Sequence, residues 1–503
     1  MRKFWVVLLS VGLIVALTAP VLAADVKFSG SYVIQGYYED NRRIAEIPGS
    51  TLASSQRGPS DSFTWQRLRV GTVFQVAEGL SLTTRFDAME KVWGAARGVS
   101  VPGVGATYAT AYDSNGIQIP GSGEAENIKF QHVYVTFNTG IGRFIAGYYP
   151  QNAFGTSFAN SSDYAYGPRL RWDITTGPWM FALYWDKYEG QDNSYASIGT
   201  ANPQVDASKD KYQAFAIYNW GKGEAGMQLQ YAIETRASGV TGAADSDTSN
   251  YKKSSYKITP YMKAAFGPTY VEAEIIYTWG KQRIWETSSS RTDITYTGLS
   301  AYAMAKVDLK PAYVGGIFFY VSGDDAGTTD KIESGNPSGS DFNPCLILGN
   351  YDLNRWSGGM GNSNVFGGTT YNTALTRAAA NPLGGYSGVG LDNIWAYQVF
   401  VGVTPVPKLD TRLAITYAYF DRTPSTTGPS ISYTTPNNGS DGAWVSKNLG
   451  FEADLTATYK IYDNLSYMIG FGYLWAGDAF KGTNIAADVK NDYLLTHKLT
   501  LSF

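Results

Sequence analysis

The chain has 503 residues, of which 44% are hydrophobic, 17% charged and 15% aromatic, and its formal net charge is −3. The charged fraction is below the roughly 25% of soluble domains, the aromatic content excludes a disordered chain, and the net charge excludes the basic surface of a nucleic-acid binder. One cysteine and two histidines leave no internal disulfide, no CxxC or haem-attachment motif, and little material for histidine-based metal or catalytic sites. We therefore expect no cofactor and no enzymatic activity.

The first segment of the chain has the three parts of a secretory signal. Arg2 and Lys3 precede a short apolar run, and small or apolar residues, Val21 and Ala23, stand at the −3 and −1 positions of a cut after Ala23. Because this run is shorter than the roughly 20 residues of a membrane-spanning helix, a cleaved signal peptide at 1–23 is favoured over a membrane anchor. The mature, exported chain is then expected to be 24–503.

Beyond the signal, hydrophobic side chains recur at every second position, which is the period of a β-strand. In the stretch from Met227 to Glu234, for example, every odd-numbered residue is large and apolar. Eighteen such segments are predicted, at 27–38, 63–76, 80–89, 127–137, 141–149, 168–175, 179–187, 211–220, 224–235, 253–265, 269–280, 293–308, 311–321, 393–404, 408–420, 445–460, 464–475 and 492–503.

The links between these segments alternate between eight short turns, rich in Gly, Pro and Asn, and nine long polar loops. Both ends of the chain fall on the short-turn side. This pattern predicts an all-β fold: a closed antiparallel transmembrane β-barrel of about 18 strands, within a range of 16–20, with short periplasmic turns and long extracellular loops. A soluble sandwich or propeller would not segregate its loops in this way.

Such a barrel belongs in the outer membrane of a Gram-negative cell, in contact with lipid and lipopolysaccharide. Aromatic residues near the ends of the strands, such as Trp185 and Trp279, suit the membrane interfaces. The chain ends in a strand with Phe503 as its last residue, which resembles the signal that the outer-membrane assembly machinery recognises.

Assigning the more apolar face of each strand to lipid leaves twelve basic and ten acidic side chains pointing inward. The second to sixth segments hold six arginines, with Asp87 and Asp173 as their only inward acids, whereas acids dominate the seventh to eleventh. The residues expected to line a pore are the basic Arg67, Arg69, Arg85, Arg143, Arg169, Arg171 and Arg412 and the acidic Asp87, Asp173, Glu272 and Glu274.

An arginine-rich wall attracts anions and binds carboxylate or phosphate groups. The alternative is that these arginines pair with the acids as a structural network. If the wall acts as a filter, a modest anion preference is expected, which Arg67→Ala with Arg69→Ala should reduce.

The seventh long link, at about 322–392, is rich in Gly, Asn and Ser, and links of this length are usually functional or disordered. It can either cover the outer mouth or fold into the barrel. Asp324, Asp325 and Asp330 form a candidate weak calcium site, although their spacing is not that of an EF-hand, and a solvated acidic loop is the alternative.

Three stretches carry a resemblance to a known family. They are Gln66–Gly71 leading into Leu82–Asp87, Tyr320–Asp325 running on to Phe342–Pro344, and the closing strand to Phe503. In these the chain resembles the alginate-export group of eighteen-stranded outer-membrane channels and its porin-like relatives. The resemblance implies a monomeric barrel whose arginine-rich lumen passes an anionic polysaccharide.

The leading hypothesis is therefore a passive channel, either for small anionic solutes or for export of an acidic polysaccharide. Two alternatives remain open. One is a barrel that sheathes a periplasmic or electron-carrier partner protein, and the other is a surface adhesin or receptor whose long loops carry the binding.

Overall fold

A computed structural model describes the strands and parts of the links between them. The described residues are 25–41, 44–46, 60–93, 128–161, 165–191, 207–236, 251–285, 293–325, 327–328, 330–335, 337, 341–350, 352–353, 391, 393–423, 445–481 and 485–503. The predicted signal peptide, 1–23, lies outside the described residues and stays a prediction.

Eighteen long strands follow one another at the predicted positions, with ends that differ from the predicted ones by a few residues. They are β1 (Asp25–Glu39), β3 (Asp61–Ala77), β4 (Leu80–Val92), β5 (Ile128–Thr139), β6 (Gly142–Pro150), β7 (Tyr166–Thr176), β8 (Trp179–Gln191), β9 (Ala207–Asn219), β10 (Gly223–Arg236), β11 (Tyr251–Phe266), β12 (Thr269–Trp285), β13 (Ile294–Asp308), β14 (Ala312–Val321), β16 (Ile394–Val406), β17 (Leu409–Phe420), β18 (Asn448–Tyr462), β19 (Leu465–Ala476) and β21 (Asp492–Ser502).

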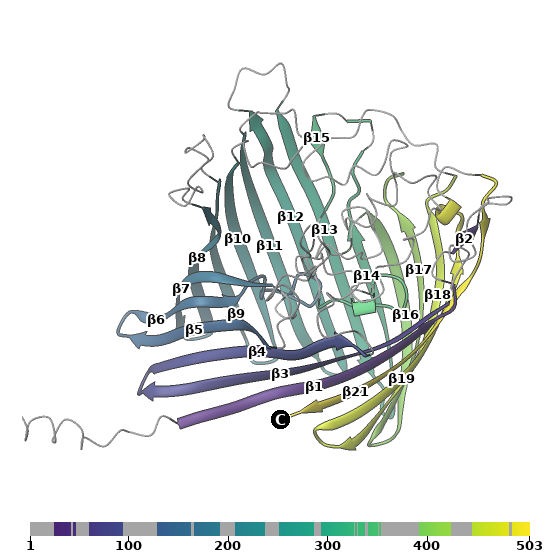
Figure 1. Ribbon diagram of the computed structural model, residues 1–503, viewed down its shortest axis with the longest axis horizontal. Coiled ribbons are helices and arrows are strands. Elements are labelled where there is room, and N and C mark those ends of the chain that lie inside the picture. The colour runs from purple at the N-terminus through teal and green to yellow at the C-terminus, as the bar shows by residue number, and fades with distance from the viewer. Residues whose placement is uncertain are drawn as a thin grey trace, which may run out of the picture.

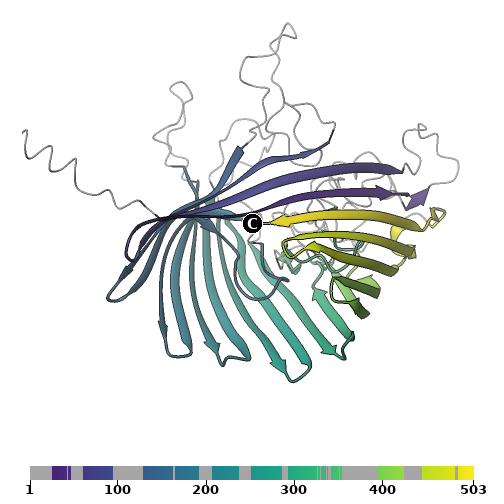
Figure 2. The same ribbon diagram turned by 90° about the horizontal axis from the view of Figure 1, so that it is seen from below.

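Each of these strands pairs antiparallel with its neighbours, and the first strand closes the ring (Figures 1 and 2). On one side β1 pairs with β3, and on the other it pairs with β21, where Ser31 lies opposite Ser502. Beyond this register the backbones of Gly30 and Phe503 exchange two hydrogen bonds, of 2.7 and 3.0 Å. The predicted closed eighteen-stranded barrel is thus confirmed, and closure leaves no open sheet edge in the membrane.

Side chains alternate across the wall because successive residues of a strand point to opposite faces. Along β10, Met227 and Leu229 are 45% and 48% exposed on the outer face, whereas Gln228 between them is only 5% exposed on the inner face. The exposed face is apolar and suits lipid, and the inner face carries the polar residues, as in an outer-membrane barrel.

The short turns join the strands at one end of the barrel, and glycine supplies the backbone conformation that they need. Gly221, between β9 and β10, has φ of 85°, and Gly267, between β11 and β12, has φ of 61°. Residues other than glycine adopt this left-handed region only at a cost.

The long links carry short elements that the sequence pattern did not predict. β2 (Ala45–Glu46) pairs with β20 (Asp488–Val489), which joins the first long link to the last. β15 (Lys331–Ile332) adds in parallel to the outer end of β13, and a short 3₁₀ helix, η4, spans Asp478–Lys481. None of the helical turns in the described part of the chain has the length and hydrophobicity of a membrane-spanning helix.

Candidate functional site

Charged side chains on the inner face of β3 to β5 form one closed network. Arg69 donates Nε to Asp87 Oδ1 at 2.7 Å and Nη2 to Asp87 Oδ2 at 2.8 Å, and both side chains are buried. Gln131, the extra residue of a bulge in β5, donates to Asp87 Oδ2 at 2.5 Å and accepts from Arg85 Nη2 at 2.6 Å. The charges of Arg69 and Asp87 therefore neutralise each other within the wall.

The same arrangement recurs on β7 and β8. Arg169 donates Nε and Nη2 to the two oxygens of Asp186, at 2.5 and 2.8 Å, and Asp186 is fully buried. Gln213 of β9 donates a third hydrogen bond to this carboxylate, at 2.8 Å. The guanidinium of Arg169 also lies 4.2 Å from the ring centroid of Tyr184, a stacking contact that further fixes it.

Between these two networks, two arginines share one carboxylate. Arg143 Nε lies 2.9 Å from Asp173 Oδ1, and Arg171 Nε lies 2.8 Å from Asp173 Oδ2. The side chain of Arg143 is 43% exposed, against 11% for Arg171 and 4% for Asp173. This triad therefore carries one more positive charge than negative charge, and Arg143 is its accessible member.

The remaining predicted basic residues have weaker or neutral partners. Arg67 Nη1 lies 3.6 Å from Glu90 Oε1. Arg412 donates Nη2 to Gln398 Oε1 at 2.6 Å, and its guanidinium lies 4.4 Å from the ring centroid of Phe400.

Two expectations about the inward charges are wrong. Glu90 joins Asp87 and Asp173 on the wall of the second to sixth segments, and acids do not dominate the seventh to eleventh. Lys209 pairs with Glu234 at 3.6 Å, and two further lysines, Lys211 and Lys253, occupy the same face. Glu90 and Lys209 lie just outside the predicted segments 80–89 and 211–220, because the strands extend beyond their apolar stretches. Lys211 and Lys253 are the first residues of their predicted segments and are not among the side chains predicted to point inward.

Part of the link between β6 and β7, residues 151–161, is held against the inner face of distant strands, and we call it the first inward segment. The ring of Phe154 lies 5.0 Å from the ring of Tyr261 on β11. Thr156 donates its N–H and its hydroxyl to Glu274 Oε2 on β12, at 2.9 and 2.5 Å. The predicted lumen acid Glu274 is thus an anchor for backbone that would otherwise be unsatisfied.

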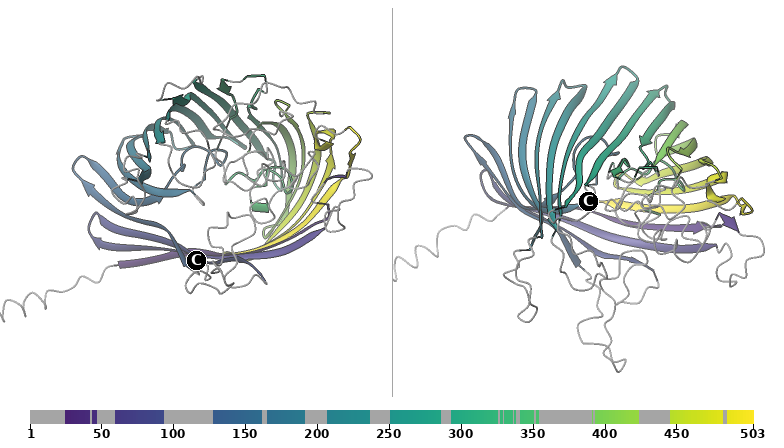
Figure 3. Two further views of the ribbon diagram at one scale, coloured as in Figure 1. Left: turned by 45° about the horizontal axis from the view of Figure 1, so that its top comes forward. Right: turned by 90° about the horizontal axis from the view of Figure 1, so that it is seen from above.

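A second stretch of coil, residues 341–350, lies against the inner face of β16 to β19, and we call it the second inward segment. The backbone N–H groups of Ile347 and Leu348 each donate to one oxygen of Glu452 on β18, both at 2.7 Å. Within the predicted long loop at 322–392, this part therefore folds into the barrel rather than over its mouth (Figure 3).

The thiol of Cys345 lies close to the same anchor. Cys345, Glu452 and Asp454 form the group of potential metal ligands whose atoms lie within reach of one another in the described residues. The carboxylates already accept backbone N–H groups of the second inward segment, including that of Leu346 at 3.3 Å from Asp454 Oδ2, so they act as anchors. Burial raises the pKa of the Cys345 thiol well above its ordinary value, which keeps the thiol protonated and unreactive.

The two inward segments touch. The N–H of Asp341 donates to the carbonyl of Asn160 at 3.1 Å, and the ring of Phe158 packs edge-on against Phe342 with centroids 5.4 Å apart. Together they form a continuous bridge inside the barrel, from β6 and β7, past β12, to β18.

The last predicted acid, Glu272, supports this bridge indirectly. Glu272 Oε1 accepts the hydroxyl of Tyr302 at 2.8 Å, and the ring of Tyr302 stacks on Phe158 with centroids 5.4 Å apart.

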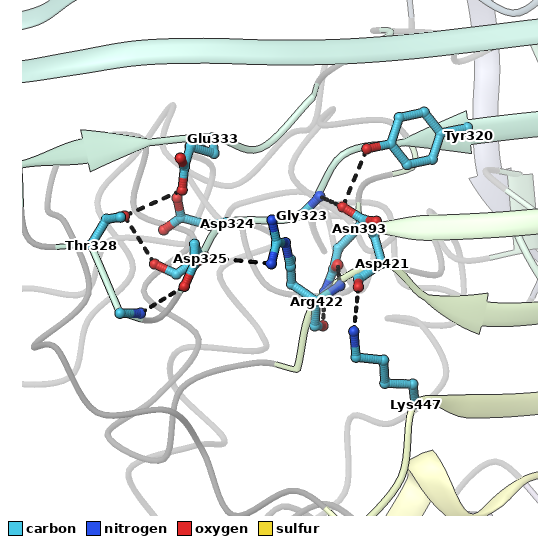
Figure 4. Close-up of polar contacts among 11 residues, drawn as sticks. Tyr320, Gly323, Asp324, Asp325, Thr328, Glu333, Asn393, Asp421, Arg422 and Lys447 are labelled. Carbon is cyan, nitrogen blue, oxygen red and sulfur yellow. Dashed lines mark hydrogen bonds and ion pairs between the residues drawn. The ribbon is translucent and has the colours of Figure 1, made fainter.

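The three aspartates of the candidate calcium site are not brought together as a ligand set in the described residues. Asp324 Oδ1 accepts the N–H of Glu333 at 2.8 Å, and Asp325 forms an ion pair of 3.4 Å with Arg422 (Figure 4). The backbone carbonyl of Asp330, by contrast, accepts the N–H of Thr295 at the start of β13.

These contacts belong to a polar network that ties the outer ends of β14, β16 and β17 together (Figure 4). The carboxylate of Asp421 accepts the N–H of Gly323 at 2.9 Å and the indole N–H of Trp395 at 2.8 Å. The side chain of Asn393 exchanges two hydrogen bonds with the backbone of Arg422, at 2.8 and 3.0 Å. We call this set of contacts the rim network.

The sequence pattern missed the anchoring contacts of the inward segments because it treats links as solvated. One signal was available. The link after β6 contains Phe154 and Phe158, and the second inward segment contains the apolar run of Leu346, Ile347 and Leu348, all of which would be unfavourable in an exposed loop.

Comparison with known proteins gives one family match. Residues 267–491 match the family model described as "Alginate export". A comparison with curated proteins finds no significant match.

Solved structures that align with this chain include the following three. The outer-membrane channel DcaP of Acinetobacter baumannii aligns with a TM-score of 0.41 and 11% identity, covering 96% of this chain and 98% of that one. Salmonella typhi OmpF in complex with daunomycin aligns with a TM-score of 0.40 and 11% identity, covering 96% and 98%. Pseudomonas aeruginosa OpdK with vanillate aligns with a TM-score of 0.42 and 9% identity, covering 95% and 99%.

Proposed function

We propose that the chain is an outer-membrane channel that passes small anionic solutes by passive diffusion. Its strands close an eighteen-stranded barrel, and residues 267–491 match the alginate-export family model. The pore-lining residues of this proposal are the inward arginines of β3 to β7, with Arg143 and Arg171 as those that act on a passing anion.

The observation that carries the proposal is the triad of Arg143, Arg171 and Asp173. Two guanidiniums share one carboxylate, and Arg143 is 43% exposed on the inner face. A net positive charge at a water-filled passage with low-dielectric walls raises the local concentration of anions. Arg69 and Arg169 contribute less to such a field, because each is matched by a buried carboxylate.

The bridge of the two inward segments favours small solutes over a polymer. It crosses the interior from β6 and β7 to β18, and it is held by the carboxyl groups of Glu274 and Glu452. A passage narrowed in this way selects by size as well as by charge. Export of an acidic polysaccharide would require this bridge to move.

The test is the reversal potential of the reconstituted full chain under a salt gradient. The wild type should be modestly anion-selective, and Arg143→Gln with Arg171→Gln should shift the reversal potential toward the cation side. The matched control, Arg143→Lys with Arg171→Lys, keeps both charges and should keep the selectivity. The preference should weaken with salt, since the screening length falls from about 10 Å at 0.1 M to about 3 Å at 1 M.

A cation-selective wild type, or a Gln variant that behaves like the wild type, would overturn the proposal. Current block by acidic oligosaccharides of increasing length separates the two substrate classes. Small solutes are supported if only short oligosaccharides enter, and polymer export is supported if long ones pass.

A further inference from the structure

The lipid-facing side of the wall has a hollow of about 860 Å³ over β5 to β12. Its lining is almost wholly apolar and includes Leu170, Trp172, Leu183 and Leu229. Leu170, Leu183 and Leu229 are 48–55% exposed, so they belong to the outer face rather than to the lumen. A recess on this face can hold hydrocarbon chains that a smooth barrel wall would only touch.

A continuous row of aromatic residues borders this hollow. Trp185, Tyr212, Tyr231, Tyr256 and Trp279 lie opposite one another in register across β8 to β12. Neighbouring rings of the last four lie 5.0–6.3 Å apart between centroids. Aromatic rows of this kind mark the level of the lipid headgroups.

The next row outward, two residues further along each strand, carries two lysines and one aspartate. It consists of Lys187, Asp210, Ile233, Ser254 and Lys281, again in register. Lys187 pairs with Asp210 at 2.9 Å, Lys281 is exposed, and the exposed Lys252 follows one row further out. These strand ends lead into the long links, so the lysines lie at the outer-leaflet side of the membrane.

The hollow, the aromatic row and the lysines beyond it together fit one kind of lipid. Its acyl chains would lie in the hollow, its sugar headgroup at the aromatic row, and its anionic groups beside the lysines. We propose that this surface binds a phosphorylated glycolipid of the outer leaflet, the lipid A part of lipopolysaccharide. A second copy of the chain fits less well, because a symmetric contact over this face would bring lysines of the same row against each other.

The test uses the full chain in detergent, titrated with lipid A and with dephosphorylated lipid A, and bound lipid is counted by native mass spectrometry. Lys252→Gln with Lys281→Gln should weaken binding of lipid A about thirty-fold, since each lysine near an anionic lipid surface contributes about 1 kcal/mol. Binding of the dephosphorylated lipid should be weaker in the wild type and unchanged by this substitution. The matched control is Lys222→Gln with Lys408→Gln, at the short turns on the opposite membrane side.

A second substitution tests the hollow itself. Ala214 lies between Leu183 and Leu229 on the outer face, so Ala214→Trp should fill the recess and weaken both lipids. Ala457→Trp, at an outward position on β18 away from the hollow, is the control and should weaken the binding of neither lipid. Equal binding by the lysine variants and their control would overturn the proposal, as would equal binding of both lipids by the wild type. A change of oligomeric state in Ala214→Trp without loss of lipid would assign the surface to a second copy instead.

Discussion

The wall of β3 to β8 and the wall of β16 to β18 both bury acidic side chains, but they use them in opposite ways. In the first, Arg69 and Arg169 are matched within the wall by Asp87 and Asp186 on neighbouring strands. In the second, the carboxylate of Glu452 faces backbone N–H groups of the second inward segment. An ion pair within the wall stiffens the barrel, whereas a carboxyl group that binds a link holds that link inside the barrel.

The difference between the two walls follows from the hydrogen-bond partner that each acidic side chain has. Arginine offers a planar fork that matches a carboxylate on the next strand. A carboxyl group without such a partner can instead accept hydrogen bonds from two adjacent backbone N–H groups. A segment inside the barrel needs such acceptors, because its buried N–H groups are otherwise unsatisfied. Stability should therefore depend most on the first wall, and the width of the passage on the second.

Arg169→Met is expected to have the largest effect. It leaves Asp186 buried without its ion pair, and breaking one side of a buried pair costs about 3–5 kcal/mol of the free energy of unfolding. The measurement is the urea midpoint of the barrel in detergent. Arg143→Met is the control, because Asp173 keeps Arg171, and it should cost less than about 1 kcal/mol. Equal losses from the two variants would contradict the distinction between matched and shared charges.

Glu452→Ala should release the second inward segment with little loss of barrel stability. Two buried N–H groups lose their acceptor, at a cost of about 2–4 kcal/mol to the segment's attachment. The single cysteine, Cys345, then reports the release, because its buried thiol becomes accessible and its raised pKa falls. We expect faster maleimide labelling and a larger single-channel conductance. Glu224→Ala, which removes a carboxylate outside this anchor, should label at the wild-type rate.

Gly155→Ala should loosen the first inward segment by a smaller amount. Gly155 has φ of 84°, and an added Cβ would lie 2.1 Å from Glu274 Oε1, so alanine meets both strain and a clash. The strain alone is about 1–2 kcal/mol. A rise in conductance without a change in the urea midpoint is expected. Gly140→Ala, in a short turn where nothing lies within 4 Å of the added Cβ, is the control.

The rim network should show the smallest effect, a dependence on pH. Burial raises the pKa of Asp324 to about 7, against the lowering effect of the N–H donated by Glu333, and the charges of Glu333 and Asp325 raise it further. The folded chain thus holds a proton that an exposed aspartate would release near pH 4. The network is therefore most stable in acid and loses stability as the pH rises from about 4 to about 7.

Hydrogen exchange of the segment after β14, compared at pH 5 and pH 8 after correction for the intrinsic rates, measures this change. Exchange should be faster at pH 8 in the wild type, and Asp324→Asn should remove the difference. An unchanged difference in the variant would mean that another group of the rim network titrates.

The alternation of side chains was sufficient to predict the strands, because lipid on one face and water on the other impose a period of two on every spanning segment. The alternation of short and long links likewise predicted closure and the number of strands. Strand ends were less well predicted. Lys209 and Glu90 lie near the ends of strands, outside the predicted segments, where the apolar face gives way to polar residues although the pairing continues.

The sequence by itself therefore determined the barrel and the alternation of its inner and outer faces, since both follow from local periodicity. Only the tertiary structure decided which charges pair with each other and which links fold inward. Asp173 lies beside both Arg143 and Arg171, and Glu452 meets Ile347 across 105 residues of sequence. Such contacts depend on register between strands and on the path of the links, and neither leaves a periodic trace in the sequence.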